Sequence, residues 1–506
     1  MTSSDAKHKG LGLRLLAALV LFASVAGCGT MLKESAFSDG EGTTRRTVNQ
    51  GAAGSGGGAT AGSTIPGQAG AGGTDATAGS AGGGAADPTG SGGQAATGPN
   101  QASDTGVTET AIKVGNITAV NGALGPDAFS PLLRGSKLFF QAVNESGGIN
   151  GRKVDFESCD DAENPNQDKS CAQKLIEGSG VFAMVGGSTD TFAAASYING
   201  KGVPDIGYPI GNAYYKYPNL FAILGAKGYP RDGSAVGVNG TAYVQTGVYR
   251  HFKNQVGVSK AAVLYYSIAI SKTAGDFIAK GLDLEGIPVA YTPGGGSGII
   301  PTQQSYDSDV IAMRDAGVDG IWNAIDIAGF QKLCLAMDRN SFTVKANVST
   351  VQGWSQKVGR DFSAPCRNSI YANALSVPYS QTSDPNIAAI TDAAARYDPQ
   401  GYLHQWVVDG WAGGKLLADA VSSMGPAPTR TGVVSYINAL RDYTYGGLMA
   451  PVDWRPSFDF SAPSDDCFSL GRWDDGAGTF VNALGGDTFQ CAAAPWYGYV
   501  PVDDGS

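Results

Sequence analysis

The chain has 506 residues, and 45 Asp and Glu against 35 Lys and Arg give it a formal net charge of −10 at pH 7. No segment gathers Lys and Arg into a basic stripe, which argues against nucleic-acid binding because phosphate neutralisation needs clustered cations. The part expected to fold, from residue 108 onward, has roughly 400 residues, too many for one ordinary core, so we expect two domains or lobes.

The first 27 residues have the layout of a secretory signal. Lys7, Lys9 and Arg14 precede an apolar stretch, 15–27, that is too short to span a bilayer. The stretch ends in small residues before Cys28 and resembles a bacterial lipobox. This resemblance implies cleavage before Cys28 and a diacylglyceryl group on its thiol, whereas the alternative is an ordinary cleaved signal with an incidental cysteine. No later segment is long and apolar enough to span a membrane.

Residues 28–107 are predicted to be a tether. From Gly51 onward the segment consists almost entirely of Gly, Ala, Ser and Thr. Such a composition offers no apolar surface to offset the entropy of ordering, so we expect a flexible linker between a lipid anchor and a folded body.

From residue 111 the pattern alternates between strand and helix. In the first run we expect strands at 111–120, 153–158, 181–187 and 203–209, with helices at 131–146, 167–178 and 189–202 between them. In the second run we expect strands at 260–266, 287–292, 318–325 and 345–350, with helices at 271–286, 306–317 and 328–340. Strands alternating with helices predict βαβ units and parallel sheets, so the two runs indicate two α/β lobes.

The C-terminal third adds two helices and a different tail. Residues 404–425 predict a long helix that packs back on the first lobe, and 433–443 predict another. The segment after Pro451 is rich in Trp, Phe, Asp and Gly and is expected to form strands and loops.

Seven cysteines become six if Cys28 carries a lipid. Six cysteines allow 15 connectivities, and we expect sequence neighbours to pair in an oxidising compartment. The predicted disulfides are Cys159–Cys171, Cys334–Cys366 and Cys467–Cys491. The acidic loop between the first two raises the alternative of a metal site, but no histidine is near and the cysteine spacing is too long for a usual zinc site. Asp160 and Asp161 are therefore expected to be turn-forming residues.

Catalytic signatures are missing. The chain has 3 histidines, no Gly-x-Ser-x-Gly, His-Glu-x-x-His or Walker sequence, and its glycine-rich loop at 293–298 lacks dinucleotide-binding spacing. We expect no enzyme activity, no cofactor and no metal. A secreted glycosidase stays an alternative because its carboxylates leave no short motif.

The stretch "LRGSKLFFQAVNESGGINGRKV", followed by a strand, Asp-Asp and a proline loop, is similar to the opening of the leucine/isoleucine/valine-binding proteins. These are type I periplasmic-binding proteins that serve ABC importers, and later segments follow the order of that family to about Trp473. The resemblance implies two Rossmann-like parallel-sheet lobes joined by a three-strand hinge. We place the crossovers near 228–240, 373–379 and 446–453. Lobe one is then 108–230 with 376–448, and lobe two is 231–375 with 449–506.

The resemblance also implies ligand contacts in the first lobe. Ser188 and Thr189 lie at a strand-to-helix turn, where a hydroxyl and helix N–H groups would hold a ligand carboxylate; the alternative is that one of them only caps the helix. The next contact loop supplies Ile210 and Asn212. Asp127 or Phe129 takes the place near the first strand where the family often has an aromatic residue.

The second lobe departs from the family pattern. Ile270 falls where the family usually has a tyrosine, Asp326 replaces a common aromatic contact, and Gln352 stands where amino-acid binders carry the Glu that holds the ammonium. Asp326 is either the substitute ammonium partner or a solvated helix cap. A further alternative is that the ligand has no ammonium and is an amide, a urea-like compound or an organic acid.

Together these features predict a monomeric, extracytoplasmic solute-binding lipoprotein. It would capture an amino acid or a related small carboxylate or amide and deliver it to an ABC permease. A ligand sensor of the same fold and, further off, a secreted enzyme are the alternatives.

Overall fold

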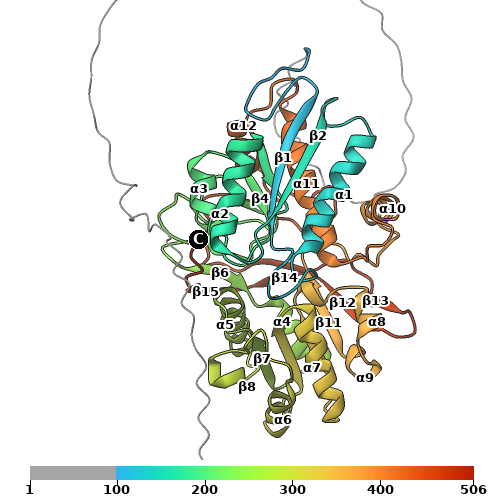
Figure 1. The fold of residues 1–506 in the computed structure, drawn as a ribbon. Coiled ribbons are helices and arrows are strands. Elements are labelled where there is room, and N and C mark those ends of the chain that lie inside the picture. The colour runs from blue at the N-terminus through green and yellow to red at the C-terminus, as the bar shows by residue number, and fades with distance from the viewer. Residues whose placement is uncertain (1–97) are drawn as a thin grey trace, which may run out of the picture. The chain divides into compact units, whose positions relative to one another are not determined.

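The computed structural model describes residues 98–506, which form two lobes built on separate β-sheets (Figure 1). The predicted signal 1–27, Cys28 and the tether up to residue 97 lie outside the described residues. The predicted fold class, α/β with two parallel-sheet lobes, is confirmed.

The first sheet has five strands in the order β2-β1-β3-β4-β5, and all its neighbours are parallel. Its strands are β1 (Ala111–Thr118), β2 (Lys153–Asp160), β3 (Ala183–Val185), β4 (Asp205–Gly207) and β5 (Leu220–Ala222). Its helices are α1 (Ser130–Glu145), α2 (Pro165–Gln173) with a π-helical continuation (Lys174–Ser179), α3 (Ala195–Gly200), the 3₁₀ helix η2 (Asn212–Tyr215), α10 (Pro385–Tyr397), α11 (Gln405–Ser423) and α12 (Arg430–Ala439). One apolar core joins α1 and α11 to the sheet and another joins α2 and α3, so both faces are covered.

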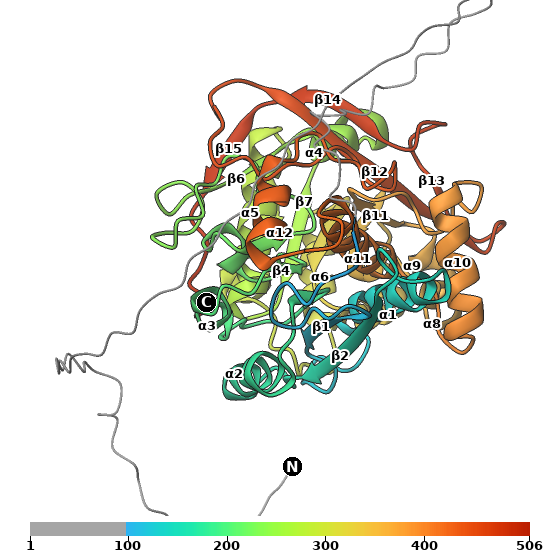
Figure 2. The same ribbon diagram turned by 90° about the horizontal axis from the view of Figure 1, so that it is seen from above.

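The second sheet has eight strands in the order β13-β12-β11-β10-β9-β7-β8, with β14 also paired to β12. Strands β7 (Ala261–Tyr265), β8 (Val289–Tyr291), β9 (Gly320–Ala324), β10 (Ala346–Ser349) and β11 (Ile370–Ala374) are parallel, whereas β12 (Ser464–Asp474), β13 (Thr479–Asn482) and β14 (Gln490–Ala494) are antiparallel to their neighbours. A two-stranded sheet pairs β6 (Ala242–Gln245) with β15 (Trp496–Tyr499). Figure 2 shows the C-terminal strands running along one side of the molecule.

The helices of the second lobe follow the predicted order. They are α4 (Gly247–His251) with a π-helical continuation (Phe252–Val256), α5 (Ala269–Leu284), η4 (Pro293–Gly296), α6 (Asp307–Asp315), α7 (Ile327–Arg339), η5 (Val351–Gly353), α8 (Lys357–Asp361) and α9 (Ala364–Arg367). The core between α4, α5 and the sheet is separate from the one that α6 and α7 join, so this sheet is also covered on both faces.

The expected helix at 189–202 is wrong over its first half. Helix α3 begins only at Ala195. Phe192 has a φ of 37°, in the left-handed region, and a right-handed helix cannot run through such a residue. Residues 189–194 therefore form an irregular loop.

Helices α1 and α11 make the most extensive helix–helix contact of the first lobe, and the predicted packing of the long C-terminal helix on this lobe is confirmed. A Cβ on Gly135 would lie 2.1 Å from the Val407 carbonyl oxygen, and one on Gly410 would lie 2.0 Å from that of Leu132. The Ser136 hydroxyl donates to the Gly410 carbonyl at 2.9 Å. Glycine is required at both crossing points because any side chain would push the helices apart.

Three segments cross between the lobes, and they lie side by side. The third crossing pairs with the second through Val377 N–H to Leu448 O, 2.9 Å, and Ala450 N–H to Leu375 O, 2.7 Å. It also pairs with the first, through Ala226 N–H to Asp453 O, 3.0 Å, and Gly228 N–H to Arg455 O, 2.8 Å. The third crossing is thus the middle strand of a narrow ribbon.

The three predicted disulfides are present: Cys159–Cys171 joins β2 to α2, Cys334–Cys366 joins α7 to α9, and Cys467–Cys491 joins β12 to β14. Within residues 98–506, no helix has the length and apolarity needed to cross a bilayer.

Replacing Gly135 by alanine should destabilise the protein by about 1–3 kcal/mol, the usual cost of overpacking a close contact. Urea unfolding of the variant measures this loss. Gly200→Ala is the matched control, because Gly200 is exposed on α3 and a Cβ there meets nothing within 4 Å. Equal stability of the two variants would contradict the close contact.

Candidate functional site

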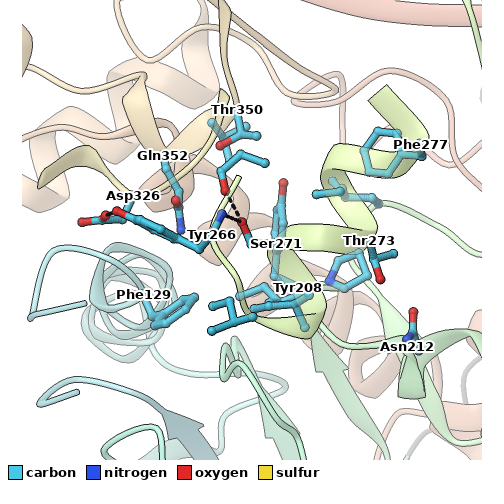
Figure 3. A pocket seen from close by; sticks show the side chains of 18 of the residues that line it. Phe129, Tyr208, Asn212, Tyr266, Ser271, Thr273, Phe277, Asp326, Thr350 and Gln352 are labelled. Atoms are coloured by element: carbon cyan, nitrogen blue, oxygen red, sulfur yellow. Dashed lines mark hydrogen bonds between the residues drawn. The ribbon is translucent and has the colours of Figure 1, made fainter. Parts of the chain in front are cut away.

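A cavity of about 310 Å³ lies between the lobes, at the carboxyl ends of both sets of parallel strands. Tyr208 directly follows β4, Tyr266 follows β7 and Thr350 follows β10, and all three line the cavity. Ligand sites on open α/β sheets form at this edge because the loops that leave the strands converge there. Figure 3 shows side chains from both lobes around the same space.

Six of the predicted ligand residues line this cavity: Phe129, Ile210, Asn212, Ile270, Asp326 and Gln352. The first three come from the first lobe and the others from the second. In Figure 3, Asp326 and Gln352 lie near one end of the pocket, and Phe277 and Asn212 lie toward the other. The structure therefore brings together residues that are up to 223 positions apart, from Phe129 to Gln352, although their contact with a ligand stays a prediction.

Asp326 is a buried helix cap. Its carboxylate accepts the N–H groups of Ala328 at 3.0 Å and Gly329 at 3.2 Å at the start of α7. It also accepts the Tyr266 hydroxyl through a short hydrogen bond. Asp326 is only 3% exposed, so the alternative of a solvated cap does not hold. The pKa of Tyr266 is raised, first by burial and then by the charge of Asp326, and Tyr266 thus stays a proton donor to the carboxylate.

Ser188 and Thr189 do not line the cavity, and their hydroxyls have protein partners. Ser188 donates to the Phe129 carbonyl oxygen at 3.1 Å, and Thr189 donates to the Asp161 carboxylate. The physical reason for their predicted role is also missing, because α3 begins six residues after Thr189 and offers no N–H groups at this turn. Ser188 supports the cavity indirectly, through the backbone of Phe129.

Asp127 does not line the cavity, and its carboxylate instead bonds to a side chain of the other lobe. Its carboxylate forms an ion pair with Lys357 of α8 and accepts the Tyr402 hydroxyl at 2.6 Å. Burial alone would raise the pKa of Asp127, but Lys357 and Tyr402 lower it overall. Nearby, the Gln352 amide donates to the Ala128 carbonyl oxygen at 3.2 Å. These contacts close one edge of the cleft.

The C-terminal tail closes another edge. Asn212 donates its backbone N–H to Asp504 at 2.6 Å and its side-chain amide to the Val502 carbonyl at 3.0 Å. Val502 in turn donates its N–H to Thr273 of the second lobe at 3.0 Å. The amide of Asn212, a predicted ligand contact, is thus already used by the chain itself.

Several lining residues were missed by sequence reasoning, among them Tyr208, Tyr266, Phe277, Trp406 and Tyr499. Tyr208 and Tyr266 could have been found, since each lies at the carboxyl end of a predicted strand. Tyr499 could not, because it reaches the cavity only through the pairing of β15 with β6, about 250 residues earlier.

The lining is mainly apolar and aromatic. Among its residues none is Lys, Arg or His, and Asp326 is the one carboxylate. Ile270 and Ser271 belong to the first turn of the 16-residue helix α5. The N–H groups of a first helical turn lack intrahelical partners and carry positive partial charge, so α5 can present donors to a carbonyl or carboxylate.

Ser271 in the cavity wall and the nearby His404 both have hydrogen-bond partners within the protein. Ser271 accepts the Tyr266 N–H at 2.7 Å and donates to the Ala324 carbonyl at 2.6 Å, so its hydroxyl is fully used. Burial lowers the pKa of the nearby His404 to about 3. Its Nδ1 accepts the Trp406 N–H and its Nε2 contacts the Gln352 carbonyl, both at 3.0 Å. The Ser271 hydroxyl and both ring nitrogens of His404 are thus bonded within the protein.

The acidic loop beside the Cys159–Cys171 disulfide lies apart from the cavity. As predicted, Asp160 organises a turn, accepting the Val120 N–H at 2.8 Å and the Ala162 N–H at 2.9 Å. Asp168 is fully buried and accepts the Ala194 N–H at 2.9 Å. Within residues 98–506, no group of three or more His, Cys, Asp or Glu is arranged to hold a metal ion.

Comparison with known proteins decides the family. A sequence profile described as "Periplasmic binding protein" matches residues 111–477. The chain belongs to the periplasmic-binding protein family. A search of curated protein sequences finds no match.

Solved structures of this family share the fold at low sequence identity. A fatty acid ABC transporter substrate-binding protein from Thermomonospora curvata is 16% identical, with a TM-score of 0.60 over 75% of this chain and 93% of its own. A solute-binding protein from R. palustris in complex with benzoate is 17% identical, with a TM-score of 0.57 and coverage of 78% and 99%. The leucine-binding protein of Thermotoga maritima is 12% identical, with a TM-score of 0.57 and coverage of 76% and 99%.

The buried carboxyl of Asp168 makes stability depend on pH. Burial, helped by the charges of Asp161 and Asp190, raises its pKa from 3.8 to about 7. The folded protein therefore holds this proton more tightly than the unfolded chain, and the stabilisation is complete below the ordinary pKa and lost as the pH rises through about 7. Asp168→Asn should raise the unfolding free energy at pH 8 by on the order of 2–4 kcal/mol, with little effect at pH 4.

Urea unfolding at several pH values measures this effect. Asp155→Asn is the control, because Asp155 is exposed on the neighbouring strand β2. If the unfolding free energy of Asp168→Asn falls with rising pH as steeply as that of the wild type, the Asp168 carboxyl does not titrate as described.

Proposed function

We propose that this protein is an extracytoplasmic solute-binding lipoprotein. It captures an amino acid or a related small carboxylate or amide between its lobes and delivers it to the permease of an ABC importer. The observation that carries the proposal is the cavity of about 310 Å³ at the strand ends, lined by residues of both lobes. Only a two-sided site of this kind couples ligand capture to the relative position of the lobes.

The residues that line the cavity are suited to bind a small solute that has an apolar portion. Aromatic and aliphatic side chains supply most of the contact surface, the first turn of α5 offers donors to a carbonyl or carboxylate, and Asp326 offers an acceptor. The related proteins are a fatty acid transporter's binding protein, a binding protein in complex with benzoate and a leucine-binding protein. Each of these ligands has an apolar body and a carboxylate.

The mechanism follows from the hinge. Because three adjacent segments connect the lobes, small backbone rotations in that ribbon open and close the cavity. A ligand that touches both lobes stabilises the closed form by its differential affinity for that form. The cross-lobe ion pair of Asp127 with Lys357 favours the same closed arrangement.

A bulky residue in the cavity should abolish ligand binding without unfolding the protein. Ala274 lies on α5 and lines the cavity, so Ala274→Trp fills the space that a solute needs. The measurement is a thermal-shift screen over amino acids, amides, ureas and aromatic acids, since a bound ligand raises the melting temperature by mass action. Every compound that shifts the wild type should fail to shift the variant.

Lys280→Trp is the control, because Lys280 is exposed on the same helix and outside the cavity. A ligand that shifts Ala274→Trp as much as it shifts the wild type would place binding elsewhere.

The lipid anchor is tested separately, since Cys28 lies outside the described residues. Cys28→Ser should move the protein from the detergent phase to the aqueous phase in a cloud-point partition, because the thiol that carries the diacylglyceryl group is lost. Mass spectrometry of the mature N-terminal peptide identifies the modification. Aqueous partition of the wild type would support an ordinary cleaved signal.

A further inference from the structure

A second cavity adjoins the first on the side of the hinge. It has a volume of about 290 Å³ and shares Tyr208, Leu224, Phe277, Thr350 and Val351 with the first. Hinge residues 373–375 form part of its wall. We call it the hinge-side chamber. Because five side chains border both spaces, a ligand in the outer cavity faces this chamber across a shared boundary.

The chamber contains carboxyl groups but no cation. Asp409 of α11 and Asp466 of β12 line it, and no Lys, Arg or His does. Burial raises the pKa of the Asp409 carboxyl to about 7, and that of Asp466 also lies above its ordinary value, chiefly through burial. Neither carboxyl has a neutralising partner among the residues that line the chamber.

Buried polar atoms of its lining residues also lack partners. The Asp409 carboxylate accepts the Ser376 hydroxyl at 2.6 Å through one oxygen, while the other has no hydrogen-bond partner. The Asn323 amide donates to Asn347 and Val348, yet its oxygen is unpaired. Both residues are only 1% exposed. Unsatisfied buried polar groups are rare in native proteins and costly. The Asn323 oxygen is an acceptor, and so is the Asp409 oxygen when that carboxyl is ionised. Two other lining residues have an unpaired buried atom, Trp322 Nε1, which donates, and Ser349 Oγ, which can donate or accept.

We infer that the hinge-side chamber is a subsite for a hydrogen-bond-donating, positively charged ligand group. This inference rests on the proposed function and deepens it by naming the ligand class: an apolar solute whose amine enters the chamber while its apolar body fills the aromatic outer cavity. An amine supplies the positive charge that the lining lacks, together with N–H donors for the unpaired oxygens of Asp409 and Asn323. A carboxylate at the same place would face Asp409 and Asp466 with the same sign of charge.

The ligand class is tested with three probes of one shape. These are 2-phenylethylamine, 2-phenylethanol and 3-phenylpropionate, which share the phenyl body and differ in the head group. Calorimetry on the full chain should give tightest binding for the amine, by about tenfold over the alcohol, the usual scale for a charged hydrogen bond. Tightest binding of 3-phenylpropionate would place the head group at α5 and overturn the inference, while the proposed function would stand.

The subsite is tested with two variants. Asp409→Asn keeps an acceptor for Ser376 but removes the charge, and it should abolish the preference for the amine over the alcohol. Asp466→Asn gives the same test should Asp409→Asn fail to fold, because asparagine can still accept the Gly247 N–H that Asp466 accepts at 2.7 Å.

Asp205→Asn is the matched control. Asp205 is 2% exposed, its carboxyl pKa is likewise raised to about 7 by burial, and it lines neither cavity. It should leave the amine preference unchanged. An amine preference that survives both chamber variants overturns the subsite. Failure of all three probes overturns the named ligand class, and the screen with Ala274→Trp then decides separately whether the cavity binds solutes.

Discussion

Backbone hydrogen bonds within the crossing ribbon hold the two lobes in register, and the site depends on them. The segment around Leu448 to Arg455 pairs on one side with 375–377 and on the other with 226–228. The three connections are therefore linked to one another, and in the mechanism that we propose the lobes rotate about that ribbon. Since the carboxyl ends of both sheets face this axis, any solute bound there touches both lobes.

Each lobe is rigid for reasons that can be read from particular residues. Gly135 and Gly410 let α1 and α11 approach until their backbones touch, and Ser136 bonds across the contact. The three disulfides each join two elements of one lobe, and none joins one lobe to the other. The disulfides therefore constrain each lobe internally, and none of them restricts a rotation of one lobe relative to the other.

The alternation of strands and helices was predictable because buried parallel strands are short apolar runs and the helices between them end at glycines such as Gly147. The disulfides were predictable because the predicted export signal implies an oxidising compartment, in which neighbouring cysteines can pair. The loop at 189–194 was not, since the left-handed backbone of Phe192 follows from tertiary packing rather than from a local motif. The position of Ser188 and Thr189 outside the cavity lining could not be predicted for the same reason.

The polar chemistry of the cleft was only partly predictable. Asp326 was recognised as a residue that departs from the family pattern, but its bond to Tyr266 joins two different strand ends and leaves no mark in the sequence. Asp409 sits in a long apolar helix, where the sequence indicates only a buried residue. Its unpaired oxygen becomes visible once the hinge, α11 and the second sheet are assembled around the chamber.

The central claim is that a ligand closes the two lobes about this ribbon. The most direct test measures the distance between spin labels at Gly200→Cys on α3 and Lys280→Cys on α5, in a Cys28→Ser background. Both positions are exposed and lie on different lobes. Addition of the ligand with the largest thermal shift should move the distance distribution to one narrower and shorter population. An unchanged distribution at saturating ligand would contradict the account.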